Sequence, residues 1–182
     1  MNQLSYVKKS IITAACIALC VILPMAFHAI PNAGSIYCPM HIPVLLCGLV
    51  CGAPFGLLCG IAGPVVSSLL TQMPPAAFLP GMVIELAAYG VIAGAMMSLV
   101  HTKKIQLDLY ISLVTALVLG RVVAGIAQAL IFSAGSYSLA VWATGYFVTA
   151  LPGLVIQLVL IPAVVFALEK AGLLPARYPK RW

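Results

Sequence analysis

Charged residues are scarce in this chain of 182 residues: they make up 7% of it, and only three are acidic. Soluble domains carry about 25% charged residues, so the composition excludes an ordinary water-soluble globular protein. It also excludes a disordered chain, because such chains combine low hydrophobicity with high net charge. With three acidic residues and three histidines in all, the chain has little material for acid–base chemistry or for a cluster of metal ligands.

Motifs of common enzymes are missing as well. The chain has no G-x-x-x-x-G-K-[ST] phosphate loop, no H-E-x-x-H and no G-x-S-x-G, the motifs of nucleotide hydrolysis, zinc-dependent proteolysis and acyl transfer. We therefore expect that the protein is not an enzyme, that it does not hydrolyse ATP by itself, and that it holds no cofactor and no metal. The six cysteines are interpreted as small apolar packing residues.

Apolar residues are what the chain has in abundance. They make up 64% of it, and the mean hydropathy is +1.18. Because one membrane crossing takes about 20 apolar residues, we predict an all-α membrane protein with six transmembrane helices, forming a single domain over residues 1–182. The expected helices cover residues 10–30, 41–52, 53–70, 81–100, 110–133 and 141–168.

Basic residues predict how this domain lies in the membrane. The net charge is +6, and all nine basic residues except Arg121 flank apolar stretches, at the N-terminus, in the segment 101–109 and in the C-terminal tail. Cytoplasmic loops carry an excess of Lys and Arg, so we expect a multi-pass protein of the cell membrane with both termini in the cytoplasm. The basic residues form no face with interleaved aromatics, so we expect no nucleic-acid partner.

Three loops are predicted to face the outside. Residues 31–40, 71–80 and 134–140 contain no charged residue and are rich in Pro, Gly, Ser, Tyr and Met. This composition suits compact caps over a cavity better than solvated linkers.

Two charged residues fall inside predicted helices, Glu85 and Arg121. A charge at that depth costs at least about 2.5–3.5 kcal/mol, so each should face a cavity or a partner. Three interpretations stay open: a structural Glu85–Arg121 pair, an Arg121 that binds helix-end carbonyls, and an Arg121 that meets a polar or anionic ligand group with Glu85 beside it. A guanidinium suits a carboxylate, phosphate or ring carbonyl.

Polar and aromatic residues extend these two positions into a candidate binding site. Some lie one or two helical turns from Glu85 or Arg121, some lie in or beside the expected outer loops, and one is polar inside the last helix. The candidate substrate-binding residues are Asn32, Tyr37, His41, Glu85, Tyr89, Arg121, Gln128, Tyr146 and Gln157.

Several stretches are similar to one transporter family. The first helix carries an A-x-x-x-A pattern, Ala14 to Ala18, just after Lys8-Lys9. Residues 41–52, 67–69 and 85–94 also look like that family. In this setting of six helices and about 180 residues, the chain resembles the substrate-binding S components of energy-coupling factor (ECF) transporters.

The resemblance implies a specific function. S components bind vitamins and related micronutrients, and they work with a transmembrane coupling protein and two cytoplasmic ATPases as an ABC importer. In that family the A-x-x-x-A face, here Ala14 and Ala18, docks on the coupling protein. The ligand sits near the outer side beneath the first outer loop, here Asn32–Met40, and the S component topples in the membrane to release it.

Other functions remain in competition. A stand-alone small-solute transporter is the main alternative, although secondary transporters often show internal repeats and the two halves of this chain show none. A membrane-embedded enzyme is disfavoured by the missing acid and base groups. Glu85 and Arg121 argue against a purely structural subunit, because such a subunit does not require charged residues in its membrane-spanning helices.

Overall fold

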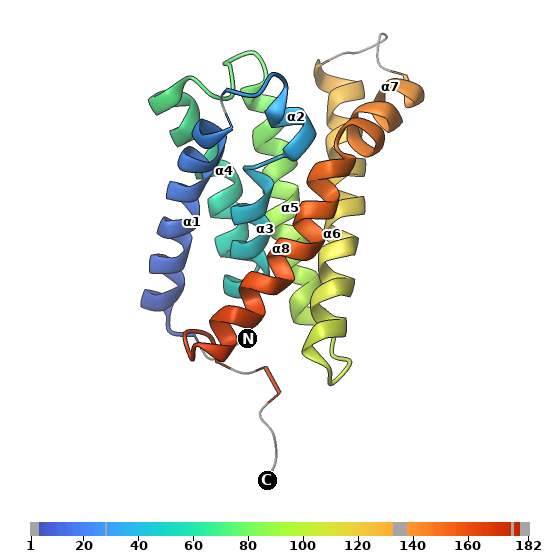
Figure 1. The fold of residues 1–182 in the computed structure, drawn as a ribbon. Coiled ribbons are helices and arrows are strands. Elements are labelled where there is room, and N and C mark those ends of the chain that lie inside the picture. The colour runs from blue at the N-terminus through green and yellow to red at the C-terminus, as the bar shows by residue number, and fades with distance from the viewer. Residues whose placement is uncertain (1–3, 28, 133–137, 176, 179–182) are drawn as a thin grey trace.

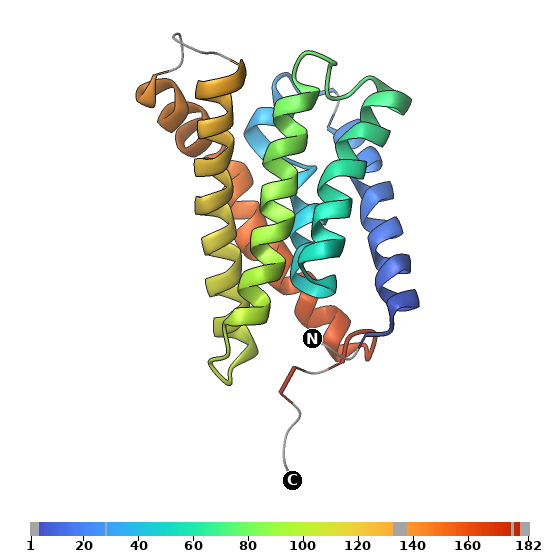
Figure 2. The same cartoon turned by 180° about the vertical axis from the view of Figure 1, so that it is seen from behind.

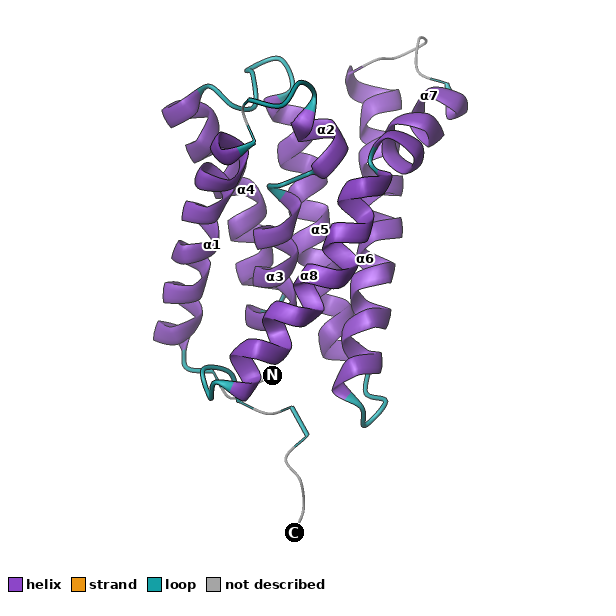
Figure 3. Cartoon of the chain, viewed as in Figure 1, coloured by secondary structure: helices purple, strands orange, loops and turns teal. Residues whose placement is uncertain are grey.

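The computed structural model describes residues 4–27, 29–132, 138–175 and 177–178, and every regular element in these ranges is a helix (Figure 3). Six helical segments are long and apolar enough to cross a membrane (Figure 1). The predicted all-α fold with six transmembrane helices is therefore confirmed. The six segments are Tyr6–Ala26, Ala33–Cys51, Ala53–Thr71, Leu79–Leu99, Ile105–Phe132 and Leu151–Lys170.

Most of these segments are single helices. They are α1 (Tyr6–Ala26), α4 (Ala53–Thr71), α5 (Leu79–Leu99) and α6 (Ile105–Ala127), the last continued by a π-helical turn, η1 (Gln128–Phe132). The second segment contains α2 (Ala33–Tyr37) and α3 (His41–Cys51).

The last expected helix, 141–168, differs from the structure. It consists of α7 (Leu139–Ala143), a π-helical stretch η2 (Thr144–Thr149) and α8 (Leu151–Lys170). The break falls at Ala150, whose φ of −84° and ψ of 5° are not helical. Pro152 follows in the first turn of α8, where a missing N–H costs no helical hydrogen bond.

The first expected outer loop also contains regular structure. Residues 31–40 hold α2, which begins after Asn32 (φ 57°) and ends before Cys38 (φ 48°). At the other end of the second segment, Gly52 separates α3 from α4 with a φ of 95°, a backbone conformation that glycine adopts without steric cost. This turn connects α3 to α4 through one residue, without a longer loop.

Glycines bring α4 and α5 into backbone contact, and the two helices lie side by side (Figure 2). A Cβ on Gly56 would lie 2.3 Å from the carbonyl oxygen of Gly90, and one on Gly90 would lie 2.2 Å from that of Gly56. Gly60 meets the Leu86 carbonyl in the same way, at 2.5 Å. Small residues permit this approach where lipid provides no hydrophobic drive for association.

The two ends of the bundle differ in chemistry. One end, at the top of Figure 1, carries α2, α7 and the α4–α5 connection. The opposite end carries the start of α1, the α5–α6 connection and the end of α8. All described lysines lie at or near this second end: Lys8, Lys9, Lys103, Lys104 and Lys170.

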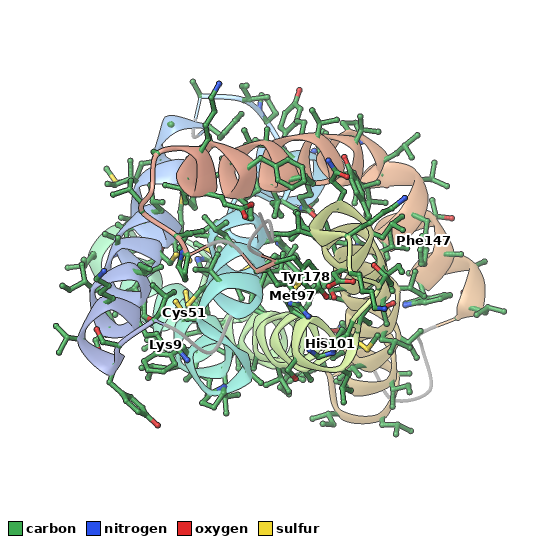
Figure 4. The ribbon with its side chains drawn as sticks, turned by 90° about the horizontal axis from the view of Figure 1, so that it is seen from below. Lys9, Cys51, Met97, His101, Phe147 and Tyr178 are labelled. Atoms are coloured by element: carbon green, nitrogen blue, oxygen red, sulfur yellow. The ribbon has the colours of Figure 1, made fainter. Side chains whose placement is uncertain are left out.

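A buried carboxylate binds residues 177–178 at the basic end. Asp108, in the first turn of α6, is fully buried and accepts from Thr102 N at 2.7 Å and Thr102 Oγ1 at 2.6 Å. Arg177 Nε lies 2.9 Å from Asp108 Oδ2, and the Tyr178 hydroxyl donates to the same oxygen. Seen from below, Tyr178 is projected onto the middle of the bundle (Figure 4).

All six cysteines are buried thiols. Five lie on α1, α3 and α4 where these helices pack together, as expected for small apolar residues. Cys51, for example, donates to the carbonyl of Lys9 at 3.8 Å, and both residues are labelled in Figure 4. Cys38, the sixth, lies between α2 and α3.

Candidate functional site

A cavity of about 1030 Å³ opens at the end of the bundle opposite the lysines. Small-molecule sites are usually clefts of about 300–1,000 Å³, so this cavity has room for a ligand and accompanying water. Its wall is built from the end of α1, residues 30–41, residues 73–78, α5, α6, η1 and η2. Segments far apart in the sequence thus meet around one space, as the candidate caps 31–40 and 71–80 require.

Glu85 supplies the negative charge of the wall from α5. Its Oε1 lies 3.0 Å from His41 Nε2, and its Oε2 accepts from the Tyr146 hydroxyl at 3.4 Å. His41 is buried, and its ring meets that of Tyr89 edge-on, with centroids 5.0 Å apart. Glu85 is therefore held by α3 and η2 while its side chain stays 13% exposed.

Arg121 supplies the positive charge from α6. It is 1% exposed, and it donates from Nε to the carbonyl of Tyr146 at 2.8 Å and from Nη1 to the carbonyl of Leu117 at 3.0 Å. The guanidinium lies over the rings of Tyr89 and Phe147, 5.7 and 5.9 Å from their centroids. Aromatic faces attract a cation at these distances, so the charge is stabilised without a carboxylate.

The contacts decide between two of the structural interpretations of Arg121. The carboxylate of Glu85 contacts His41 Nε2 at 3.0 Å, and no Glu85–Arg121 pair is present among the described residues. Arg121 instead donates to backbone carbonyls, as in the second interpretation, but these belong to Leu117 within α6 and Tyr146 within η2 rather than to helix ends. It also lines the cavity, so the third interpretation, contact with a ligand, stays open beside the second.

The position of Arg121 depends on a contact with Trp142, which the sequence does not predict. The indole Nε1 of Trp142 donates to the Arg121 carbonyl at 3.0 Å. The indole fits there because residue 125 is glycine: a Cβ on Gly125 would lie 2.3 Å from Trp142 Nε1. Two hydrogen bonds thus connect Arg121 with the segment α7–η2. Arg121 donates one to the Tyr146 carbonyl and accepts the other from Trp142.

Six of the nine predicted binding residues line the cavity: Asn32, His41, Glu85, Arg121, Gln128 and Tyr146. The other three contact protein groups instead and are not part of the described wall. Tyr37 stacks on Phe27 with centroids 5.4 Å apart. Tyr89 is fully buried beneath His41 and Arg121. Gln157 is fully buried on α8.

Gln157 reaches the segment between α2 and α3. Its Nε2 donates to the Cys38 carbonyl at 3.5 Å. Near it, Gly153 lets α2 approach α8, since a Cβ there would lie 2.7 Å from the Tyr37 carbonyl oxygen. These contacts position the wall segment rather than form the wall.

The wall also contains residues that the sequence did not mark. Phe27, Met82 and Phe132 line the cavity. Apolar residues of this kind look the same in a lipid-facing, a packed and a cavity-lining position, so no signal in the sequence distinguishes them. Residues 134–137 of the third candidate cap, together with residue 133, lie outside the described residues.

The predicted docking residues lie on the outward face of α1. Ala14 and Ala18 are exposed, whereas Thr13, Cys16 and Cys20 are the buried residues of this helix. The small-residue face is therefore not used for packing within the described part of the chain.

Comparison with known proteins gives one match. The family model "ECF transporter, substrate-specific component" matches residues 8–173, nearly the whole chain. No curated protein and no solved structure matches it. A bundle of six membrane-length helices with a ligand-sized cavity at one end agrees with that description. The chain belongs to the family of substrate-specific components of ECF transporters, multi-pass membrane subunits that work with a small-molecule substrate and with the partners of the ECF module.

Proposed function

We propose that the cavity is the substrate site, and that this subunit captures a vitamin or related micronutrient there. Delivery into the cell then takes place with a transmembrane coupling protein and two cytoplasmic ATPases. The observation that carries the proposal is the cavity wall itself, a mostly apolar surface with one carboxylate, Glu85, and one guanidinium, Arg121. Ligand sites typically combine an apolar lining with a few polar groups that fix orientation.

Placing a charge within the membrane-spanning region is costly, and that cost supports a binding role. Charged residues there usually face a cavity or a substrate path. Glu85 and Arg121 come from different helices and both line the same cavity. A purely structural bundle of this size has no need for either.

Charge distribution supports an orientation with the cavity outside. The described lysines gather at the end opposite the cavity, and basic residues mark the cytoplasmic side. In this orientation both ends of the chain lie in the cytoplasm of a cell-membrane protein, and the cavity opens toward the nutrient.

Retention of small molecules tests the proposal. Detergent-purified protein is dialysed against a bacterial metabolite extract, and the retained molecules are identified by mass spectrometry. We expect one compound near equimolar amounts. Gly145 lines the cavity and has open space at its Cβ position, so Gly145→Phe should reduce retention at least tenfold, about 1.4 kcal/mol.

A matched variant separates loss of the site from general damage. Ala163→Phe adds the same side chain to an exposed position of α8 away from the cavity, and it should retain the compound as well as the unmodified protein. Equal retention in both variants would refute the cavity as the substrate site. A protein that retains nothing from the extract would refute the binding function.

A further inference from the structure

The charges in the described part of the cavity wall balance. Among the described residues that line it, Glu85 and Arg121 are the only members of the Asp, Glu, Lys and Arg group. Among the same described residues His41 is the one histidine, so their summed charge depends on whether its ring carries one N–H or two.

The surroundings of His41 provide a hydrogen-bond acceptor for one ring N–H. Its Nε2 faces Glu85 at 3.0 Å, whereas its Nδ1 is buried with no hydrogen-bond partner among the described residues. An imidazolium would bury a second N–H without an acceptor, which is costly in an apolar environment. A ring with its one N–H on Nε2 adds no charge, so the described part of the wall carries one negative and one positive charge.

Both charged groups retain hydrogen-bonding capacity toward the cavity. The bonds of Arg121 to protein carbonyls use Nε and Nη1, and within the described part of the chain Nη2 makes none. A carboxylate accepts about four hydrogen bonds, and Glu85 receives one from His41 and a long one from Tyr146. The site thus offers a donor at Arg121 and an acceptor at Glu85.

Tyr146 connects the two groups. Its backbone oxygen accepts from Arg121, and its hydroxyl donates to Glu85. The donor and the acceptor are therefore held at opposite ends of one residue, and a single ligand lying along Tyr146 can reach both.

We propose that the substrate is a molecule of zero net charge, a zwitterion or a dipolar heterocycle, with an acceptor group toward Arg121 and a donor group toward Glu85. This inference rests on the proposed function of the cavity. A net anion or cation would pair with one wall charge and leave the other, on a side chain that is at most 13% exposed, without a partner in the ligand, which is unfavourable. A bipolar neutral molecule satisfies both wall charges together.

Charge-selected binding tests the inference. A bacterial polar-metabolite extract is separated by ion exchange at pH 7 into anionic, cationic and zero-net-charge fractions. Each fraction is dialysed against the unmodified protein, Glu85→Gln and Arg121→Gln, and retained compounds are quantified by mass spectrometry. We expect the unmodified protein to enrich a compound from the zero-net-charge fraction.

The two variants should shift selectivity in opposite directions. Each should retain the neutral compound at least tenfold less well. Glu85→Gln leaves a positive wall and should favour the anionic fraction, whereas Arg121→Gln should favour the cationic fraction. Since Arg121 also holds two carbonyls, Glu85→Gln and the unmodified protein carry the test if Arg121→Gln does not fold.

Controls place the effect in the cavity. Glu169→Gln and Lys170→Gln change the net charge of the chain by the same amounts at the opposite end of the bundle, and both should keep the selectivity of the unmodified protein. Enrichment of only an anion or only a cation by the unmodified protein would overturn the inference and leave the proposed function intact. Retention from none of the fractions would overturn the proposed function.

Discussion

Arg121 shows how a charged side chain is stabilised within a membrane-spanning segment. Two of its nitrogens donate to carbonyls, and two aromatic rings face its charge. The backbone oxygen of the same residue accepts from Trp142. This arrangement fixes the side chain before any ligand arrives, which reduces the ordering that binding must impose.

The close contact between Gly125 and the Trp142 indole leads to the first prediction. Gly125→Ala places a methyl group 2.3 Å from the present position of Trp142 Nε1, so the indole must move and release the Arg121 carbonyl. Overpacking of this kind costs typically about 1–3 kcal/mol. We expect a lower unfolding temperature and a shifted Trp142 fluorescence, measured in a Trp182→Phe background that leaves one tryptophan.

Gly145→Ala is the matched control, because a Cβ there meets nothing within 4 Å. It should leave the unfolding temperature and the emission unchanged. An unaltered emission in Gly125→Ala would show that the indole does not pack against Gly125.

At the scale of residues, the sequence predicts which side chains matter better than what they touch. Glu85 and Arg121 stand out because a charge in an apolar segment needs a reason. Their partners depend on which helices become neighbours, and nothing in the local sequence encodes that His41 faces Glu85 from α3. The roles of Tyr89 and Gln157 as buried supports follow from the same neighbour relations.

At the scale of elements, α2 is the segment with the most consequence for the site. It lies over the cavity wall between two residues with positive φ, Asn32 and Cys38. It has only five residues, too few for a helix to be stable by itself. Its position therefore depends on contacts with neighbours, above all with α8.

The approach of α2 to α8 gives the second prediction. Gly153→Ala adds a Cβ that would lie 2.7 Å from the Tyr37 carbonyl and 2.8 Å from that of Ile36, so α2 must lift away. Cys38, 7% exposed beside α2, should then react several-fold faster with a maleimide. Peptide mapping of the alkylated protein measures this rate and uses the five other buried cysteines as internal references.

Gly34→Ala, within α2 itself, meets nothing within 4 Å and should keep the slow reaction of Cys38. Equal rates in Gly153→Ala and in the unmodified protein would mean that Gly153 does not set the position of α2.

Sequence patterns predict the long elements and miss the short ones. The apolar segments mark six crossings, because a membrane span needs a minimum length of apolar residues. Residues 138–150 are just as apolar, but they form α7 and η2 before α8 begins. Hydropathy records no difference between one long helix and two helices that meet at an angle, so this break is visible only in the structure.

At the scale of the whole molecule, polar groups are divided between the two ends. One end contains the cavity, and the other contains the lysines and the pair of Asp108 with Arg177. The composition indicates a membrane protein, and the spacing of basic residues indicates which connections lie together. That the C-terminal tail is fixed beneath the bundle by a buried carboxylate could not be foreseen, since its partners, Thr102 and Tyr178, are 76 residues apart in sequence (178 − 102).

The outward face of α1 provides the last prediction, which concerns the molecule within its transporter. Ala14 and Ala18 are exposed one turn apart on a helix at one flank of the bundle (Figure 1). Small residues let another helix approach closely, so Ala14→Trp and Ala18→Trp should abolish uptake in cells that contain the ECF module. Because the cavity lies elsewhere, both variants should retain the substrate as well as the unmodified protein in dialysis. Val118 is an exposed residue of α6, at the opposite flank of the bundle (Figure 2), and Val118→Trp should transport normally. Uptake that survives both alanine substitutions would exclude this face as the docking surface and would favour a stand-alone transporter.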